Sequence, residues 1–279
     1  GLLILTLGSY FSIVFWKILS FKPDGIYAGH VNVWSDWSLH ISIANIFAFK
    51  SPQFWFAYHP LYAGGQFTYP FLTNLVSGML MRMGMPLKEA FVLPSILLTL
   101  ILLVGLYFLF YLLVNSKKLS ILAVFIFFLS AGLGFIDYLK DLLNNPSFES
   151  FIYSLKEIGR YDMYQWYASN MVVGLMVPQR SFLMGVTLGV WAIVGVLYVV
   201  LRDNLADSIK IKILIFSGIL AGILPIAHAH SFIAVALITG MIFVLNLDKW
   251  RILWPYVLVA GLLSSTLYLT FIWGGIEND

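Results

Sequence analysis

Residues 90–114 read AFVLPSILLTLILLVGLYFLFYLLV, an apolar stretch without a single charged side chain. The hydrocarbon core of a bilayer is about 30 Å thick, and a helix of about 20 apolar residues is needed to cross it. This stretch therefore predicts a membrane-spanning helix. The rest of the 279-residue chain has the same character, since 61% of its residues are hydrophobic and only 10% are charged.

This composition limits the class of protein. A soluble globule must expose much of its surface to water and cannot bury so much hydrocarbon. A soluble enzyme, a disordered protein and a nucleic-acid-binding protein are therefore excluded. The absence of cysteine excludes disulfides and thiolate chemistry. We predict an all-α, polytopic integral membrane protein, located in the plasma membrane if the organism is prokaryotic.

Seven stretches in all are long and apolar enough, or nearly so, to span a bilayer. They form a single transmembrane domain over 1–279, which we expect to be a piece of a longer chain. Two long polar-aromatic stretches, 21–89 and 139–181, separate some of the spans and are expected to carry interfacial helices. The predicted spans are 2–20, 90–114, 119–138, 182–201, 211–227, 231–247 and 252–273.

Basic residues predict the orientation of these spans. They are dense in three short connections and sparse in the two long stretches. Because cytoplasmic loops carry an excess of Lys and Arg, we expect the short connections to be cytoplasmic. Both long stretches, and the turn around His228 and His230, then lie together on the opposite side. The short connections contain Lys117, Lys118, Arg202, Lys210, Lys212, Lys249 and Arg251.

Residues 66–84 bear on this orientation, because they are apolar enough to form a helix that could be taken for another span. If that helix crossed the bilayer, every later loop would change sides. The distribution of basic residues instead favours an amphipathic helix that lies in the interface, within the first outer stretch. Four polar residues interrupt it: Thr73, Asn74, Ser77 and Arg82.

The first outer stretch also holds Asp36, with Trp34 and Trp37 beside it. This group suits sugar recognition, because sugar faces stack on aromatic rings while a carboxylate takes a hydroxyl proton. The alternative is that Asp36 only caps the start of a helix. His40 follows at i+4 on the same helical face, so the pair is also compatible with a divalent cation such as Mg or Mn. His59 is either a supporting residue of the site or a packed, hydrogen-bonded side chain.

The order of these features resembles the GT-C superfamily of membrane glycosyltransferases, which includes oligosaccharyltransferases and protein O-mannosyltransferases. An Asp after the first span, an interfacial helix, Tyr-Pro-Phe-Leu at 69–72 and Ala-Phe-Val-Leu-Pro-Ser at 90–95 carry the resemblance, which covers roughly residues 1–140. It implies two external helices in the first outer loop and a catalytic acid at Asp36. Many members have a second acid next to the first, whereas Trp37 follows here.

The second outer stretch contributes further candidates. In similar oligosaccharyltransferases an acidic site occupies this loop, and Asp162 is the nearest match. Arg160 lies two residues before it. Asp141, Glu149 and Glu157 are competing acids that a solvated surface also explains.

Three basic or imidazole side chains lie at the predicted ends of spans. The guanidinium of Arg180 either snorkels to the membrane surface or clamps a phosphate through parallel N–H donors. Imidazoles at the depth of His228 and His230 are costly unless they are partnered. They are therefore either functional or a buried, hydrogen-bonded pair.

Together these features favour a glycosyltransferase that moves a sugar from a polyprenyl-phosphate-linked donor to an acceptor hydroxyl or amide on the extracytoplasmic side, with inversion. Asp36 is the expected general base, and Asp162 the expected acceptor-orienting acid. Basic groups would stabilise the departing phosphate. These groups are Arg180, Arg160, His228 and His230.

Two other classes of protein remain open. One is a transporter or lipid flippase, although the inverted repeats common in transporters are not visible. The other is a non-catalytic membrane scaffold. The sequence has no Walker loop, zinc-protease motif, nucleophile elbow or dinucleotide fingerprint. The expected partners are the lipid-linked donor and membrane lipids, with no nucleic acid; the sequence does not identify the acceptor.

Overall fold

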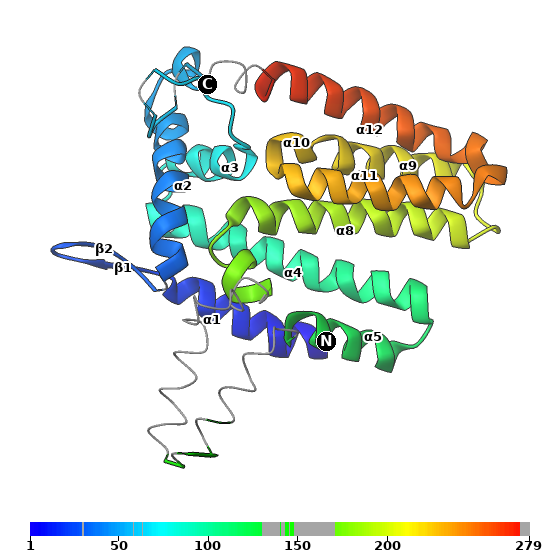
Figure 1. Cartoon of the computed structure of the whole chain (residues 1–279), viewed down its shortest axis with the longest axis horizontal. Helices are drawn as coiled ribbons and strands as arrows, with labels where there is room; N and C mark the ends of the chain where they lie inside the picture. The colour runs from blue at the N-terminus through cyan, green and yellow to red at the C-terminus, as the bar shows by residue number, and fades with distance from the viewer. Residues whose placement is uncertain are drawn as a thin grey trace.

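A computed structural model describes most of the chain and confirms that it is mostly helical (Figure 1). The described residues are 1–29, 31–57, 59–62, 64–129, 140, 143–144, 146–147 and 171–273. The helices are α1 (Ser9–Lys17), α2 (Val31–Phe49), α3 (Leu72–Arg82), α4 (Leu87–Val114), α5 (Lys117–Leu129), α8 (Arg180–Leu201), α9 (Asp207–Gly222), α10 (Leu224–Ala227), α11 (Ala229–Val244) and α12 (Trp250–Phe271). Short π- or 3-10-helices occupy Ile4–Gly8, Pro52–Phe54, Met171–Met176 and Leu247–Lys249.

The prediction of an all-α fold misses one small hairpin. Strands β1 (Leu19–Lys22) and β2 (Gly25–Ala28) pair antiparallel. Pro23 and Asp24 form the turn between them, and Gly25 follows with a φ of 152°, which favours glycine. Most side chains of both strands are exposed. No alternation of buried and exposed residues therefore marks them in the sequence.

Within the described ranges, four helical segments are long and apolar enough to cross a membrane, compared with the seven predicted spans. Two of the other predicted spans correspond to shorter apolar helices, Ile4–Lys17 and Ala229–Val244. The third begins with α5 and is described only as far as Leu129. The four long segments are Leu87–Val114, Arg180–Leu201, Asp207–Ala227 and Leu247–Phe271.

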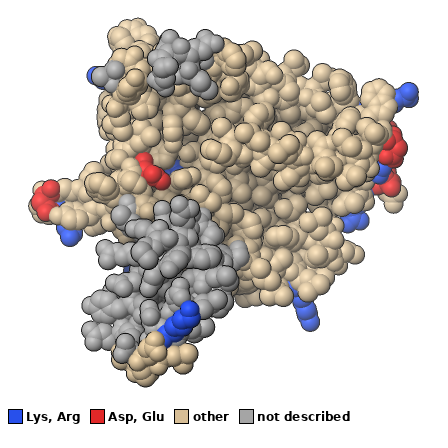
Figure 2. Space-filling model, viewed as in Figure 1, with Lys and Arg blue, Asp and Glu red and all other residues tan. Residues whose placement is uncertain are grey.

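The long helices lie side by side, with α8 between α4 on one side and α9 and α11 on the other (Figure 1). The connections α4–α5, α8–α9 and α11–α12 lie at one end of this bundle, on the right in Figure 1. Several charged side chains gather at that end (Figure 2). The hairpin, α2 and α3 lie at the opposite end, where α2 runs across the ends of the other helices.

Helices α2 and α3 pack tightly against each other. A Cβ added at Gly78 of α3 would lie only 2.6 Å from Cβ of Phe47 and 2.7 Å from the carbonyl oxygen of Ala44. Glycine at 78 thus permits this close approach. With 11 residues, α3 is about 16 Å long. It is too short to cross the bilayer core of about 30 Å.

The start of α2 differs from the prediction. The helix begins at Val31, so Asp36 lies in its second turn and neither Ser35 nor Asp36 caps it. Val33 and Trp37, four residues apart, are both buried, and their packing extends the helix toward the hairpin. Farther along α2, an apolar stripe faces inward. Its buried members include Ile43, Ile46 and Phe47.

Candidate functional site

Arg180 lies at the first position of α8 and is fully buried, with 0% of its surface exposed. Its Nη2 donates to Ser77 Oγ of α3 at 2.6 Å and, at 3.4 Å, to the carbonyl oxygen of Phe91 of α4. The guanidinium carbon lies 4.1 Å from the ring centre of Phe91 and 5.7 Å from that of Trp37. Three helices therefore enclose this cation, and it does not snorkel to the surface.

The guanidinium of Arg180 has no anionic partner within the described part of the chain. Among the residues that the structure describes, no carboxylate pairs with it, and its Nε and Nη1 atoms have no hydrogen-bond acceptor. Cation–π contacts offset part of the cost of burying such a charge. The remaining cost is high, because an unpaired buried charge is strongly unfavourable. Within the described residues, no anion balances the charge of this site.

His40 of α2 extends this buried cluster. It is 2% exposed, and its Nδ1 lies 3.1 Å from Oδ1 of Asn74 on α3. Burial and the positive charge of Arg180 together lower the pKa of His40 to about 3, although the bond to Asn74 acts in the opposite direction. The imidazole is therefore neutral at pH 7. Its ring also meets the edge of Tyr69, with the ring centres 6.2 Å apart.

Asp36 lies half-buried on α2, one turn before His40. Burial raises the pKa of Asp36, and a hydrogen bond from Ser35 partly offsets that rise. Burial and, to a smaller extent, the Asp36 carboxylate raise the pKa of Tyr69, whereas a hydrogen bond with Ser181, the neighbour of Arg180, lowers it. Asp36 is therefore less buried than His40 and lies near enough to Tyr69 for its charge to act on that hydroxyl.

The two predicted sugar-stacking rings have different environments. Trp34 is 73% exposed. Trp37 is 1% exposed, and its Nε1 donates to the carbonyl oxygen of Val177 at 3.3 Å. Trp37 therefore packs under Arg180 instead of offering an open ring face to a sugar, and this part of the prediction is corrected.

His228 and His230 lie near α8 but not within the cluster. The ring of His228 meets the edge of Phe182, with centres 5.5 Å apart, and its Nδ1 accepts from the backbone N–H of Ser231 at 3.2 Å. His228 thus caps the start of α11. His230 is exposed, and its ring centre is 5.4 Å from that of His228. The pair belongs to the same end of the bundle as Arg180.

The remaining predicted residues are not drawn into this cluster. His59 lies in a turn, where its Nδ1 accepts from the N–H of Leu61 at 3.2 Å and its ring stacks on Phe67. This arrangement fits a packed, hydrogen-bonded side chain. Arg160 and Asp162 lie outside the described residues. The same holds for the competing acids Asp141, Glu149 and Glu157.

The arrangement gives no positive support for a metal site. No group of three or more His, Cys, Asp or Glu side chains that could hold an ion occurs within the described ranges. Asp36 and His40 share one helical face, but His40 directs Nδ1 at Asn74 and is buried.

Sequence reasoning did not select the polar partners that complete the cluster. The relevant signal was the polar interruptions of segment 66–84. Asn74 and Ser77 are three residues apart, which places them on one face of α3, and both are at most 1% exposed. Buried polar side chains in a short apolar helix indicate an inward-facing polar site, as they do here.

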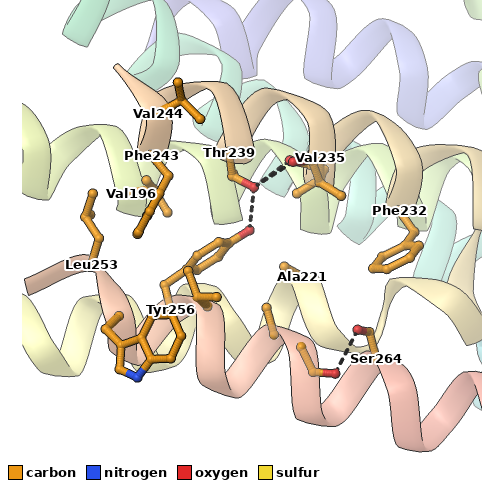
Figure 3. A pocket seen from close by; sticks show the side chains of 16 residues that line it. Val196, Ala221, Phe232, Val235, Thr239, Phe243, Val244, Leu253, Tyr256 and Ser264 are labelled. Atoms are coloured by element: carbon orange, nitrogen blue, oxygen red, sulfur yellow. Dashed lines mark hydrogen bonds between the residues drawn. The ribbon is translucent and has the colours of Figure 1, made fainter. Parts of the chain in front are cut away.

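A separate apolar cavity of about 450 Å³ lies between α8, α9, α11 and α12 (Figure 3). Its polar contact is the hydroxyl of Tyr256, which donates to Thr239 Oγ1 at 3.0 Å. Gly240 and Gly261 also line it, and a Cβ at either position would meet nothing within 4 Å. None of the residues around Arg180 lines this cavity.

Comparison of the chain with family models, curated proteins and solved structures finds no match.

Proposed function

We propose that this protein is a membrane glycosyltransferase that takes its sugar from a polyprenyl-phosphate-linked donor. The observation that carries the proposal is the fully buried guanidinium of Arg180, which has no anionic partner in the described residues. Asp36, a half-buried carboxylate with a raised pKa, lies one turn before His40 on α2, and the charge of Arg180 acts on that imidazole. An anion-binding cation and a basic carboxylate are the two groups that transfer from a phosphate-linked sugar requires.

The proposal includes an orientation in the membrane. Seven spans would place the α4–α5, α8–α9 and α11–α12 connections in the cytoplasm, in agreement with their basic residues. The Arg180 cluster lies at the opposite end of the bundle (Figure 1). Helix α2 runs across that end and α3 is too short to span, as expected for helices in the interface. A lipid-linked donor would then present its phosphate to Arg180 from the outer leaflet.

The reaction would proceed as a single displacement at the anomeric carbon. Asp36 accepts the proton of the acceptor hydroxyl or amide as that group forms its bond to the anomeric carbon. The bond from the anomeric carbon to the phosphate oxygen breaks, and the phosphate leaves with the electron pair. Arg180 stabilises the charge that develops on this oxygen. Attack opposite the leaving group inverts the anomeric centre.

The raised pKa of Asp36 has a consequence for this reaction. A carboxylate with a higher pKa is a stronger base, provided that it remains ionised at the working pH. The transfer rate should therefore fall as the pH drops through this raised pKa. An exposed aspartate would keep its activity to lower pH.

The test is transfer of radiolabelled sugar from polyprenyl-phosphate donors to membrane acceptors, with the purified protein in liposomes. Asp36→Asn is expected to lower the rate at least about 100-fold, which is typical for loss of a general base, without lowering the melting temperature. The matched control is Asp24→Asn, in the exposed turn of the hairpin. Undiminished transfer by Asp36→Asn would remove the assigned base.

The same liposomes separate the alternative classes. Flux of a lipid or solute without sugar transfer would identify a transporter or flippase. Neither activity, together with full tolerance of Asp36→Ala in cells, would identify a scaffold.

A further inference from the structure

Asn74 and His40 form a second buried group beside Arg180. We infer that the Asn74 amide is a second donor to the bound phosphate and that His40 is the positioning residue that orients this amide. The inference rests on Arg180 as the phosphate-binding residue of the proposed function.

The first support is that Asn74 has an unused donor. Asn74 is 1% exposed, and its Nδ2 has no hydrogen-bond acceptor among the described residues. Buried polar groups in proteins are normally satisfied, so an orphaned donor indicates a partner outside the described residues, which we take to be the bound anion. The same condition applies to Nε and Nη1 of Arg180.

The second support is that these donors are neighbours. Asn74 lies one turn before Ser77 on α3, and Ser77 accepts the 2.6 Å bond from Arg180. His40 is bonded to Asn74, and the charge of Arg180 acts on its imidazole. One buried region therefore contains orphaned N–H groups from α3 and from the start of α8.

The chemistry of this region selects an oxyanion. The free groups are donors, Arg180 supplies a full positive charge, and the N-terminus of the 22-residue α8 adds a partial positive charge. A cation would be repelled. A phosphate group carries several acceptor oxygens in a tetrahedral arrangement, so it can bond to the guanidinium and the amide at once.

His40 determines which end of the Asn74 amide is free. A neutral imidazole that donates through Nδ1 to Oδ1 of Asn74 leaves Nδ2 available to the anion. The opposite amide orientation would direct an oxygen to this region and disfavour an anion. The two orientations therefore predict opposite results in a binding experiment.

The test uses the purified protein in detergent and two probes, dodecyl phosphate and inorganic pyrophosphate, with the shift in melting temperature as the readout. Dodecyl phosphate is expected to raise the melting temperature saturably. A shift with dodecyl phosphate alone assigns the site to a lipid phosphate, and a shift with both probes assigns it to phosphate in general. A wild-type protein that responds to neither probe overturns the inference.

Asn74→Asp is the decisive variant, because it has the same shape and replaces the donor with a carboxylate. The new acid would pair with Arg180, so we expect the fold to be kept and the affinity for dodecyl phosphate to fall at least about tenfold. Asn45→Asp, the same change at an exposed position of α2, is expected to bind as the wild type does. Unchanged binding by Asn74→Asp overturns the role of Asn74.

Positioning by His40 is tested by rescue. His40→Asn retains an N–H near the place of Nδ1 and should keep most of the dodecyl phosphate affinity, whereas His40→Leu should lose it while remaining folded. Equal binding by both variants overturns the role of His40. Dodecyl phosphate carries no sugar, so these results do not depend on whether the protein transfers one.

Discussion

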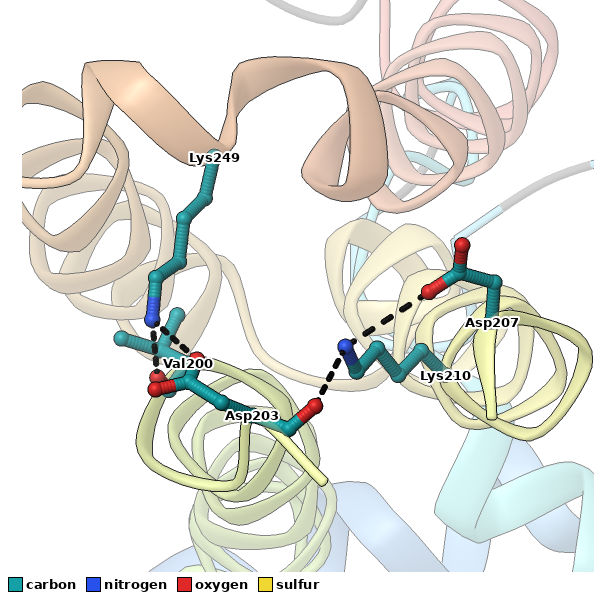
Figure 4. A network of polar contacts seen from close by, with 5 residues as sticks. All are labelled: Val200, Asp203, Asp207, Lys210 and Lys249. Atoms are coloured by element: carbon teal, nitrogen blue, oxygen red, sulfur yellow. Dashed lines mark hydrogen bonds and ion pairs between the residues drawn. The ribbon is translucent and has the colours of Figure 1, made fainter. Parts of the chain in front are cut away.

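The positively charged side chains at the two ends of the helical bundle have different partners. At one end, Lys249 donates to Asp203 Oδ1 and to the carbonyl oxygen of Val200, both at 2.8 Å (Figure 4). Lys210 pairs with Asp207 at 3.5 Å and donates to the carbonyl oxygen of Asp203 at 3.1 Å. These acids are largely exposed. At the other end, the buried Arg180 contacts a hydroxyl, a carbonyl oxygen and two aromatic rings. None of its partners among the described residues is an acid.

This difference separates charges that are neutralised by an ion pair from a charge that is free to bind a ligand. The hydrogen bond and the charge of Lys249 lower the pKa of Asp203, which is the usual sign of a settled ion pair. Arg180 has no such partner among the described residues, and burial of an unpaired charge lowers stability. A cation in that state is typical of a binding site, where the ligand supplies the missing charge.

The largest effect on this comparison is expected for the variant Arg180→Met. We expect sugar transfer to fall at least about 100-fold, because a donor to the leaving group is lost. We expect the melting temperature to stay the same or rise, since no buried acid is left unpaired when the cation is removed. Activity assays and thermal unfolding of the same preparation measure both effects. A large loss of stability with activity retained would assign Arg180 a structural role.

The second test uses pH. The pKa of His40 is about 3 in the folded protein and about 6.5 when unfolded. As the pH falls, His40 is therefore protonated in the unfolded chain before it is protonated in the folded protein. Stability is lost as the pH falls below about 6.5. At pH 5 the loss should be about 2 kcal/mol in the free energy of unfolding.

Unfolding of the wild type and of His40→Asn across this pH range measures the effect. The substitution should remove this part of the pH dependence, while His230→Gln, at an exposed position, should leave it in place. The same slope in His40→Asn as in the wild type would show that His40 does not cause it.

The smallest effect is expected at the opposite end of the bundle. Lys249→Met should leave the melting temperature and the transfer rate unchanged within error, because a pair with an exposed acid contributes little. Raising the salt concentration, which screens the exposed ion pair of Lys249, should likewise leave the melting temperature and the transfer rate unchanged. A Lys249 variant as inactive as Arg180→Met would erase the contrast between the two ends.

The long helices were predictable because apolar runs of sufficient length have few other structures available. The small hairpin was not, since its strands are short and mostly exposed. The start of α2 was also misplaced, because Asp36 satisfies the rules for a helix cap while the buried Val33 and Trp37 hold one more turn before it. Local chemistry suggested a boundary that tertiary packing overrides.

The candidate site was predictable only in part. Arg180 and Asp36 could be selected because a charge at the end of an apolar run is unusual. Their partners could not, since Ser77 and Phe91 lie about a hundred residues earlier in the chain, and no periodic pattern reports such distant contacts. The environments of Trp34 and Trp37 could not be predicted either. Helical spacing gives the positions of the two rings relative to each other, but it does not say which ring packs inward.

The position of Arg180 in the chain also bears on how the protein is made. Its described partners, Trp37, Ser77 and Phe91, all precede it. Ser77 is itself held by the bond that its hydroxyl donates to the carbonyl oxygen of Ala90, at 2.7 Å. Synthesis from the N-terminus therefore delivers the acceptors and ring faces before the guanidinium emerges from the ribosome. The buried charge of Arg180 therefore emerges after all of its described partners have been synthesised.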